Sequence, residues 1–311
     1  MGIKIVFLCP RNIRNTPDFG EVKRFGNLNG HAWEQIELPL YLQRNKITGL
    51  INLCNSAPLY SKNQVVTVHD LAFARHPEWF DSKFAKWYNW MIPRVINRAK
   101  HVLTVSEFSK SEIVDFYGTE GSKVSVIPNG IYWDKESIKE FENPIKDKYI
   151  LAVGSDNPRK NYDLLIRTFE QLEQNQFKLV IVGSPSKAFS TSSKKENDKI
   201  VWLQNVDNNK LKALYKNAHL LVSTSFYEGF GLPILEALEL GCPVLANGIE
   251  VFKEIYKDSI NYYQENSESD LHLQLKQILE SDKQQVSVQY LLEMLSYKSA
   301  GIKLVQILGI T

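Results

Sequence analysis

Short runs of apolar residues recur along the chain, and most are followed by a segment with helical spacing of its apolar positions. The runs are Ile3–Leu8, Leu50–Leu53, Val65–Val68, Val102–Val105, Val124–Ile127, Ile150–Val153, Leu179–Val182, Ile200–Leu203, Leu220–Val222 and Val244–Ala246. Continuous, β-branched runs that alternate with helices are typical of parallel strands buried on both faces. The pattern therefore predicts an α/β fold.

Polar residues follow the carboxyl ends of several predicted strands. His69-Asp70 follows one run, Ser106-Glu107 the next, and Gly154-Ser155 and Ser223-Thr224-Ser225 follow two runs further along. In open parallel sheets, ligands bind in the crevice outside the carboxyl ends of the strands. The sequence therefore predicts a ligand cleft at these ends.

The chain of 311 residues is longer than one average domain, so two domains are expected. Between Ile131 and Lys148 the apolar pattern gives way to a charged stretch, which we interpret as the domain junction. This divides the chain into residues 1–140 and 141–290, followed by a segment with helical apolar spacing at 291–311.

Charge and cysteine content narrow the protein class. Thirty-seven basic and 35 acidic residues leave a net charge of +2, which gives no support for nucleic-acid binding. The three cysteines, Cys9, Cys54 and Cys242, are odd in number and widely spaced, so we interpret them as reduced core residues. The first apolar run is too short for a signal peptide, and no run is long enough to span a membrane. We therefore expect a cytoplasmic protein, at most peripheral on the cytoplasmic face of the inner membrane.

The segment Glu228-Gly-Phe-Gly-Leu-Pro-Ile-Leu-Glu236 carries the clearest chemistry. It follows a predicted strand, and Pro233 suits the first turn of a helix. Gly229 and Gly231 would let the backbone approach a ligand closely, and the N–H groups and dipole of the helix start attract phosphate. The loop is therefore predicted to bind an anion.

Two carboxylates frame this loop. An ionised carboxylate only accepts hydrogen bonds, so Glu236 could bind a vicinal diol such as a ribose, and Glu228 could face sugar hydroxyls. Either glutamate alone is more simply explained as a turn residue or a solvated helix position. Their occurrence together, one on each side of a glycine-containing loop, favours the interpretation that they bind sugar hydroxyls.

Arg159 and Lys160 form a second candidate element, in the turn that follows the strand ending at Val153. They precede a segment with helical apolar spacing. Cations are disfavoured at a helix N-terminus, so two of them there indicate an anion shared with it, unless they are an ordinary exposed pair.

Together these segments resemble the family-4 retaining glycosyltransferases of GT-B fold, which have two Rossmann-like domains facing each other across a cleft. The matching motifs are Val124–Gly130, Pro158–Asn161 and Glu228–Glu236. Three further segments resemble the branch that builds bacterial surface polysaccharides, often mannosyl- or rhamnosyltransferases: Val65–Leu71, His76–Phe80 and Thr104–Lys110. The resemblance also implies that the C-terminal helix crosses back to the first domain.

The resemblance implies specific roles for the matching residues. Arg159 and Lys160 would bind the donor diphosphate, and Glu236 its ribose. Glu228 would support the departing sugar, with His69 across the cleft near the anomeric carbon. Backbone amides that hold the donor sugar and phosphate would come from Gly229, Phe230, Gly231 and Leu232.

No Asp-x-Asp motif occurs in the chain, which agrees with a family that works without a bound metal. We therefore expect no metal and no cofactor besides the nucleotide-sugar donor.

Two features depart from the family pattern: Arg11–Gly20 replaces the Gly-Gly loop of many relatives, and Ser155 stands where some have arginine. Both leave the acceptor side and part of the phosphate contacts undefined.

The predicted helix around residues 82–98 suggests a membrane-facing side. One stripe of its surface is apolar: Phe84, Trp87, Tyr88, Met91 and Val95. The neighbouring stripe is basic with one tryptophan: Lys83, Lys86, Trp90, Arg94 and Asn97. Such a helix is either a core stripe beside a solvated charged face or a contact for anionic lipid.

The expected activity is thus the retaining transfer of a hexose from a nucleotide-diphosphate sugar, such as GDP-mannose or a UDP- or dTDP-sugar. The acceptor would be a glycan or a lipid-linked glycan in surface polysaccharide biosynthesis. Two alternatives use a similar donor site: a sugar-nucleotide epimerase of the same fold, and a non-catalytic subunit that binds the donor without consuming it.

Overall fold

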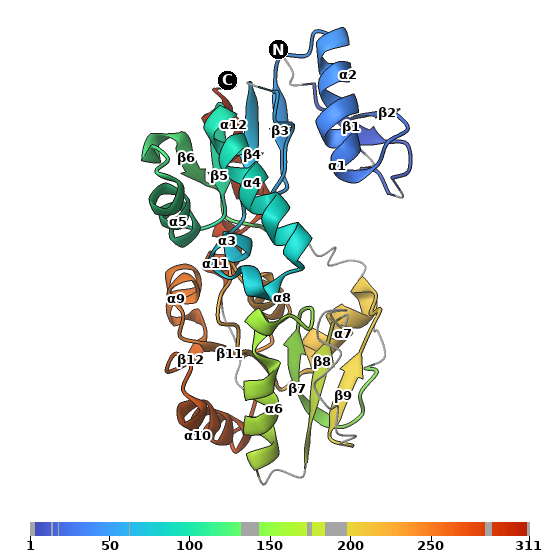
Figure 1. Ribbon diagram of the computed structural model, residues 1–311. Coiled ribbons are helices and arrows are strands. Elements are labelled where there is room, and N and C mark those ends of the chain that lie inside the picture. Colours follow the sequence, from blue (N-terminus) through green and yellow to red (C-terminus); the bar gives the residue numbers. More distant parts are fainter. Residues whose placement is uncertain are drawn as a thin grey trace.

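The computed structural model describes residues 4–13, 15–17, 19–61, 63–131, 143–172, 176–183, 198–283 and 288–309. It has an N-terminal and a C-terminal half, each an α/β arrangement of parallel strands, as Figure 1 shows. The predicted α/β class is confirmed. Most of residues 132–147, where the junction is predicted, lie outside the described residues.

The described part of the C-terminal half contains one six-stranded parallel sheet, in the order β12-β11-β10-β7-β8-β9. The strands are β7 (Lys148–Val153), β8 (Phe177–Val182), β9 (Ile200–Leu203), β10 (Leu220–Ser223), β11 (Val244–Asn247) and β12 (Asn261–Tyr263). This is the doubly wound order of a Rossmann fold. The strand order reverses between β7 and β10, which is where such sheets bind their ligands.

Helices cover both faces of this sheet. They are α6 (Tyr162–Gln171), α7 (Asn208–Asn217), α8 (Leu232–Glu239), α9 (Glu250–Tyr256) and α10 (Glu268–Leu279), with 3₁₀ turns η4 (Pro158–Lys160) and η5 (Lys257–Ser259). Along β7, Tyr149 and Leu151 join one buried cluster, while Ile150 and Ala152 join the other. Because successive strand residues point to opposite faces, each face has its own apolar core.

The described part of the N-terminal half forms two separate parallel sheets. Four strands pair in sequence order: β3 (Leu50–Asn52), β4 (Gln64–Thr67), β5 (His101–Thr104) and β6 (Val124–Val126). The first strand, β1 (Val6–Pro10), pairs instead with β2 (Glu21–Phe25). In Figure 1 this pair lies to one side of β3.

The helical elements of this half are α1 (Gly30–Ala32), the π-helical turn η1 (Trp33–Glu37), α2 (Leu38–Arg44), α3 (Ala72–Arg75), η2 (Pro77–Trp79), α4 (Ser82–Arg98), α5 (Glu107–Tyr117) and η3 (Gly121–Lys123). After the C-terminal half come α11 (Gln289–Met294) and α12 (Tyr297–Leu308). Ile131 forms a parallel bridge with Ser296, and Figure 1 places the C-terminal end beside the four-stranded sheet. The chain thus returns to the N-terminal half after the second sheet.

The predicted apolar runs coincide with strands, but two of the strands in the described part of the chain were not predicted. The sequence Glu-Val-Lys-Arg-Phe of β2 is polar because this strand is largely solvated, and β12 is only three residues long.

The interpretation of all three cysteines as core residues is wrong for Cys54, which is exposed, whereas Cys9 and Cys242 are buried. Within the described ranges, no helix is long and apolar enough to cross a membrane.

Candidate functional site

Two loops meet at the point where the C-terminal sheet reverses its strand order. The first leaves β7 and contains η4, and the second joins β10 to α8 over residues 224–231, which we call the β10–α8 loop. The carbonyl of Arg159 accepts a hydrogen bond from the Phe226 amide at 2.7 Å. This bond holds the two loops together.

A buried cluster of charges joins these loops. Arg159 Nη1 lies 2.6 Å from Oε2 of Glu228, and Lys160 Nζ lies 2.6 Å from Oε1. Both Lys160 and Glu228 are 7% exposed. The structure thus brings together the arginine and lysine of one predicted motif with the first glutamate of the other.

Burial and the two cations act on Glu228 in opposite directions. Burial raises the pKa of its carboxyl group, but Lys160 and Arg159 outweigh this effect and hold the pKa at about 2. Burial also lowers the pKa of Lys160. With both basic groups charged, the cluster of three side chains carries one net positive charge.

This cluster modifies the expectation drawn from Arg159 and Lys160. Two cations at this place indicated a shared anion, and the structure supplies one from the protein itself, Glu228. The remaining positive charge still favours an additional anion such as a diphosphate. A bound anion would therefore compete with Glu228 for the same two cations.

Two hydroxyl groups that the sequence did not single out help to build this site. Ser225 Oγ donates to Oε1 of Glu228 at 2.9 Å, and Thr224 Oγ1 donates to the carbonyl of Lys160 at 2.7 Å. Both belong to the polar run after β10. That run marked the right strand end, but not which hydroxyl would reach the carboxylate.

The β10–α8 loop leads into α8 with free amides. Among the described residues, none accepts a hydrogen bond from the N–H groups of Gly229, Phe230, Gly231 or Leu232. Gly231 has φ +90°, and a Cβ atom there would lie 2.5 Å from the Phe252 ring. Glycine is therefore required both for the turn and for packing. The helix begins at Leu232, with Pro233 in its first turn as predicted.

Phe230 contributes only its backbone to this surface. Its side chain is 3% exposed and packs in the core of the C-terminal half, edge-on to Tyr256. The Leu232 side chain, by contrast, is 41% exposed. Four amides and the positive end of the α8 dipole thus lie beside the Glu228 cluster.

Glu236 lies on α8, where it interacts with Tyr215 of α7 and with the charge of Lys160. Oε2 of Glu236 accepts a hydrogen bond from the Tyr215 hydroxyl at 2.7 Å. Burial raises the pKa of the Glu236 carboxyl group, an effect that Tyr215 and the charge of Lys160 reduce. The pair with Tyr215 uses only Oε2, so Oε1 can accept hydrogen bonds from a ligand.

His69 contacts the β10–α8 loop through its backbone. A Cβ atom on Gly229 would lie 2.6 Å from the His69 carbonyl oxygen and 2.9 Å from Asp70 Cβ, so the two halves of the protein touch here. His69 Nε2 is 3.0 Å from the Leu53 carbonyl, which can only accept. Nε2 must therefore carry a proton in this contact, and Nδ1 is left for another partner.

Asp70 is a further carboxyl group beside the cluster. Its Oδ1 accepts the Ala72 amide at 3.0 Å at the start of α3. Burial raises the pKa of Asp70, partly offset by this hydrogen bond and by the charge of Arg159. The sequence placed it after a strand but did not indicate its proximity to Arg159.

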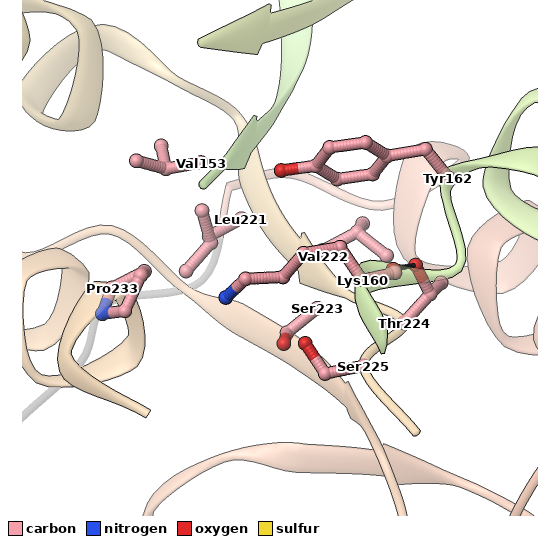
Figure 2. A pocket seen from close by; sticks show the side chains of 9 residues that line it. All are labelled: Val153, Lys160, Tyr162, Leu221, Val222, Ser223, Thr224, Ser225 and Pro233. Atoms are coloured by element: carbon pink, nitrogen blue, oxygen red, sulfur yellow. Dashed lines mark hydrogen bonds between the residues drawn. The ribbon is translucent and has the colours of Figure 1, made fainter. Parts of the chain in front are cut away.

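A pocket opens at the switch point behind the cluster. It is lined by Val153, Lys160, Tyr162, Leu221, Val222, Ser223, Thr224, Ser225 and Pro233. Figure 2 shows the Lys160 side chain extending across it from one wall toward Leu221 and Ser223. The residues come from β7, β10, η4, the β10–α8 loop and the starts of α6 and α8, as the predicted cleft at the strand ends requires.

Comparison with known proteins identifies the family. Residues 134–290 match glycosyl transferases group 1, and residues 44–135 match Glycosyltransferase Family 4. The chain is 32% identical over 221 residues to the O-antigen chain mannosyltransferase RfbU of Salmonella typhimurium, an alignment that covers 70% of this chain and 61% of RfbU. O-antigen chain mannosyltransferase B of Escherichia coli is 27% identical over 63% of this chain and 55% of its own length.

Solved structures show the same fold. Anabaena Alr3699/HepE in complex with UDP and glucose has a TM-score of 0.71 at 16% identity, covering 94% of this chain and 86% of its own. WaaG, a glycosyltransferase involved in lipopolysaccharide biosynthesis, has a TM-score of 0.68 at 18% identity, covering 93% and 88%. The fold is GT-B, as predicted. The chain spans only part of its curated relatives, 61% of the length of RfbU and 55% of the length of mannosyltransferase B. The chain belongs to the glycosyl transferases group 1 family.

Proposed function

We propose that this protein is a glycosyltransferase that moves a hexose from a nucleotide-diphosphate sugar to a glycan or lipid-linked glycan during surface polysaccharide assembly. The observation that carries the proposal is the Arg159–Lys160–Glu228 cluster beside the free amides of residues 229–232. A site with net positive charge and fixed N–H groups suits a diphosphate leaving group, because the phosphates gain negative charge as the sugar departs.

In this proposal the diphosphate contacts Arg159, Lys160 and the start of α8. Lys160 is held in place by Glu228 and by the pocket walls, so it need not be reorganised when charge develops. Glu236 binds the ribose hydroxyls through its carboxylate, oriented by Tyr215. No metal is required to neutralise the leaving group.

The sugar itself would lie between Glu228 and His69, with retention of its anomeric configuration. Glu228 stays ionised because of its two cationic neighbours, so it can accept hydrogen bonds from sugar hydroxyls and stabilise positive charge near the anomeric carbon. His69 abuts this loop from the opposite half of the protein. The epimerase and the binding-subunit alternatives share this donor site and differ only in what happens after binding.

Incubation with donor and acceptor distinguishes these functions. GDP-mannose is the first donor to test, since RfbU and mannosyltransferase B are named mannosyltransferases. We expect release of GDP that depends on an added lipid-linked glycan and persists in excess EDTA. Consumption of donor without acceptor would favour the epimerase, and intact donor with every nucleotide sugar would favour the binding subunit. Activity lost in EDTA and restored by magnesium would contradict metal independence.

We also propose that the protein works at the cytoplasmic face of a membrane, with α4 as the contact. Lys83, Lys86, Trp90 and Arg94 are all exposed on this helix. The Arg94 guanidinium lies 4.5 Å from the centre of the Trp90 ring. On the neighbouring apolar stripe Met91 and Val95 are buried, Trp87 and Tyr88 are half-buried, and Phe84 is 39% exposed. A basic face with an exposed aromatic side chain suits anionic lipid headgroups.

Co-sedimentation with vesicles tests this contact. Changing Lys83, Lys86 and Arg94 together to glutamine should weaken binding to phosphatidylglycerol-containing vesicles by about 100-fold, since each basic residue near the surface contributes about 1 kcal/mol. Binding to pure phosphatidylcholine should be weak for both proteins. A matched control changes three exposed lysines of the C-terminal half to glutamine: Lys216, Lys257 and Lys276. Equal binding of the α4 variant and this control would refute the proposed contact.

A further inference from the structure

We infer that Ser106 and Glu254 are positioning residues, through which the N-terminal half orients the Phe230 amide for donor binding. The inference rests on the proposed function. It arises from the side chains that cross between the two halves at the β10–α8 loop, a set of contacts distinct from the Arg159–Lys160–Glu228 cluster.

Ser106 connects the two halves through its hydroxyl group. It is 1% exposed, and its Oγ donates to the Gly229 carbonyl at 2.8 Å while accepting the Ser109 amide at 3.0 Å as the N-cap of α5. One hydroxyl thus caps the N-terminus of a helix in the N-terminal half and holds a loop of the C-terminal half.

The bond to Gly229 also determines the direction of the next amide. In a planar trans peptide, the C=O and the following N–H point in opposite directions. Because Ser106 fixes the Gly229 carbonyl toward the N-terminal half, the Phe230 N–H must point away from Ser106. This N–H is one of the four free amides beside Glu228.

Glu254 holds Ser106 in place from the opposite half. Its Oε1 and Oε2 accept the amides of Glu107 and Phe108, each at 2.8 Å. These are the first residues of α5, directly after Ser106, so the carboxylate also lies at the positive end of the α5 dipole. Glu254 comes from α9, which packs along α5.

Tyr227 reinforces the same arrangement. Its hydroxyl accepts the Leu71 amide at 3.1 Å and donates to Glu112 of α5. The close approach of Gly229 to His69 leaves no room for a side chain between the halves. The residues on either side of Glu228 are therefore both held by the N-terminal half, so the donor surface is complete only when the halves are in contact.

The experiment compares Ser106→Gly with Ser106→Thr, using GDP-mannose as the probe. Glycine is almost as good an N-cap as serine but cannot donate to Gly229, whereas threonine keeps the hydroxyl group. We expect Ser106→Gly to raise the KM for GDP-mannose and its calorimetric Kd by about fivefold, with little change in kcat, as for the loss of one oriented hydrogen bond. Ser106→Thr should restore both values. Ser111→Ala, an exposed serine of the same helix, is the control.

Glu254→Ala should produce a similar or larger rise in KM and Kd, because it frees the start of α5. The control Glu250→Gln, on the exposed side of α9, should leave both values unchanged. Wild-type affinity in Ser106→Gly would overturn the inference, even if the wild-type protein transfers sugar. If the wild-type protein binds GDP-mannose but transfers nothing, the proposed function fails while the Kd comparison still decides the role of Ser106. An equal loss of affinity for GDP-mannose in Ser106→Gly and Ser106→Thr would also overturn the inference.

Discussion

Replacing Glu228 with glutamine is expected to lower transfer by about 100-fold or more while leaving the affinity for GDP equal to or higher than that of the wild-type protein. The carboxylate is bonded to Arg159 and Lys160 at 2.6 Å and competes with any diphosphate for them. Its loss raises the net charge of the cluster from one to two, which favours an anion. The same loss removes the group proposed to stabilise the sugar.

The comparison of kcat with the calorimetric Kd for GDP checks this prediction. Retained GDP binding also shows that the variant is folded. Glu250→Gln makes the same chemical change at an exposed position and should leave both quantities unaltered. Wild-type turnover of Glu228→Gln would refute the assignment of Glu228, and a large loss of GDP affinity would show that it supports the phosphates instead of the sugar.

Replacing Lys160 with alanine should weaken both stability and GDP binding. Removing one partner of a buried ion pair costs about 3–5 kcal/mol, because the other charge stays buried. For a domain of this size we expect a fall of about 10 °C in the melting temperature. The Kd for GDP should rise at least about tenfold, because the variant loses a cation that contacts the diphosphate.

A thermal melt with and without GDP measures both effects. Lys178→Ala is the matched control, since its pair with Asp147 at 2.7 Å is largely solvated and should contribute little to the melting temperature. An unchanged melting temperature and GDP-induced shift in Lys160→Ala would contradict the buried-pair interpretation. The two variants at the cluster thus have opposite expected effects on GDP affinity, which separates the sugar role from the phosphate role.

The order of strands and helices in the C-terminal half could be predicted because it depends on local patterns. Apolar runs such as Ile150–Val153 and Leu179–Val182 are buried on both faces, so their composition alone marks them as central strands. The strand Glu21–Phe25 escaped prediction because it is largely solvated and lacks such a run. Its pairing with β1 follows from tertiary packing, not from its composition.

Candidate residues were predictable where one short segment holds them. The glycines and Pro233 of the β10–α8 region have conformational requirements that the sequence states directly. Ser106 and Gly229, by contrast, are 123 positions apart, and Glu254 lies 147 positions from Glu107. No local pattern connects such pairs, because their contact depends on how the two halves of the protein pack against each other.

The sequence by itself determined the α/β class, the resemblance to a nucleotide-sugar-binding family, and the chemical groups available: two cations, two carboxylates and a glycine-rich loop before a helix. Only the tertiary structure decided that Glu228 neutralises one charge of Arg159 and Lys160, that Glu236 pairs with Tyr215, and that Ser106 holds Gly229. The physical reason is that composition and spacing act through short-range preferences, whereas the partner of each charge and hydroxyl is set by elements that meet across the fold.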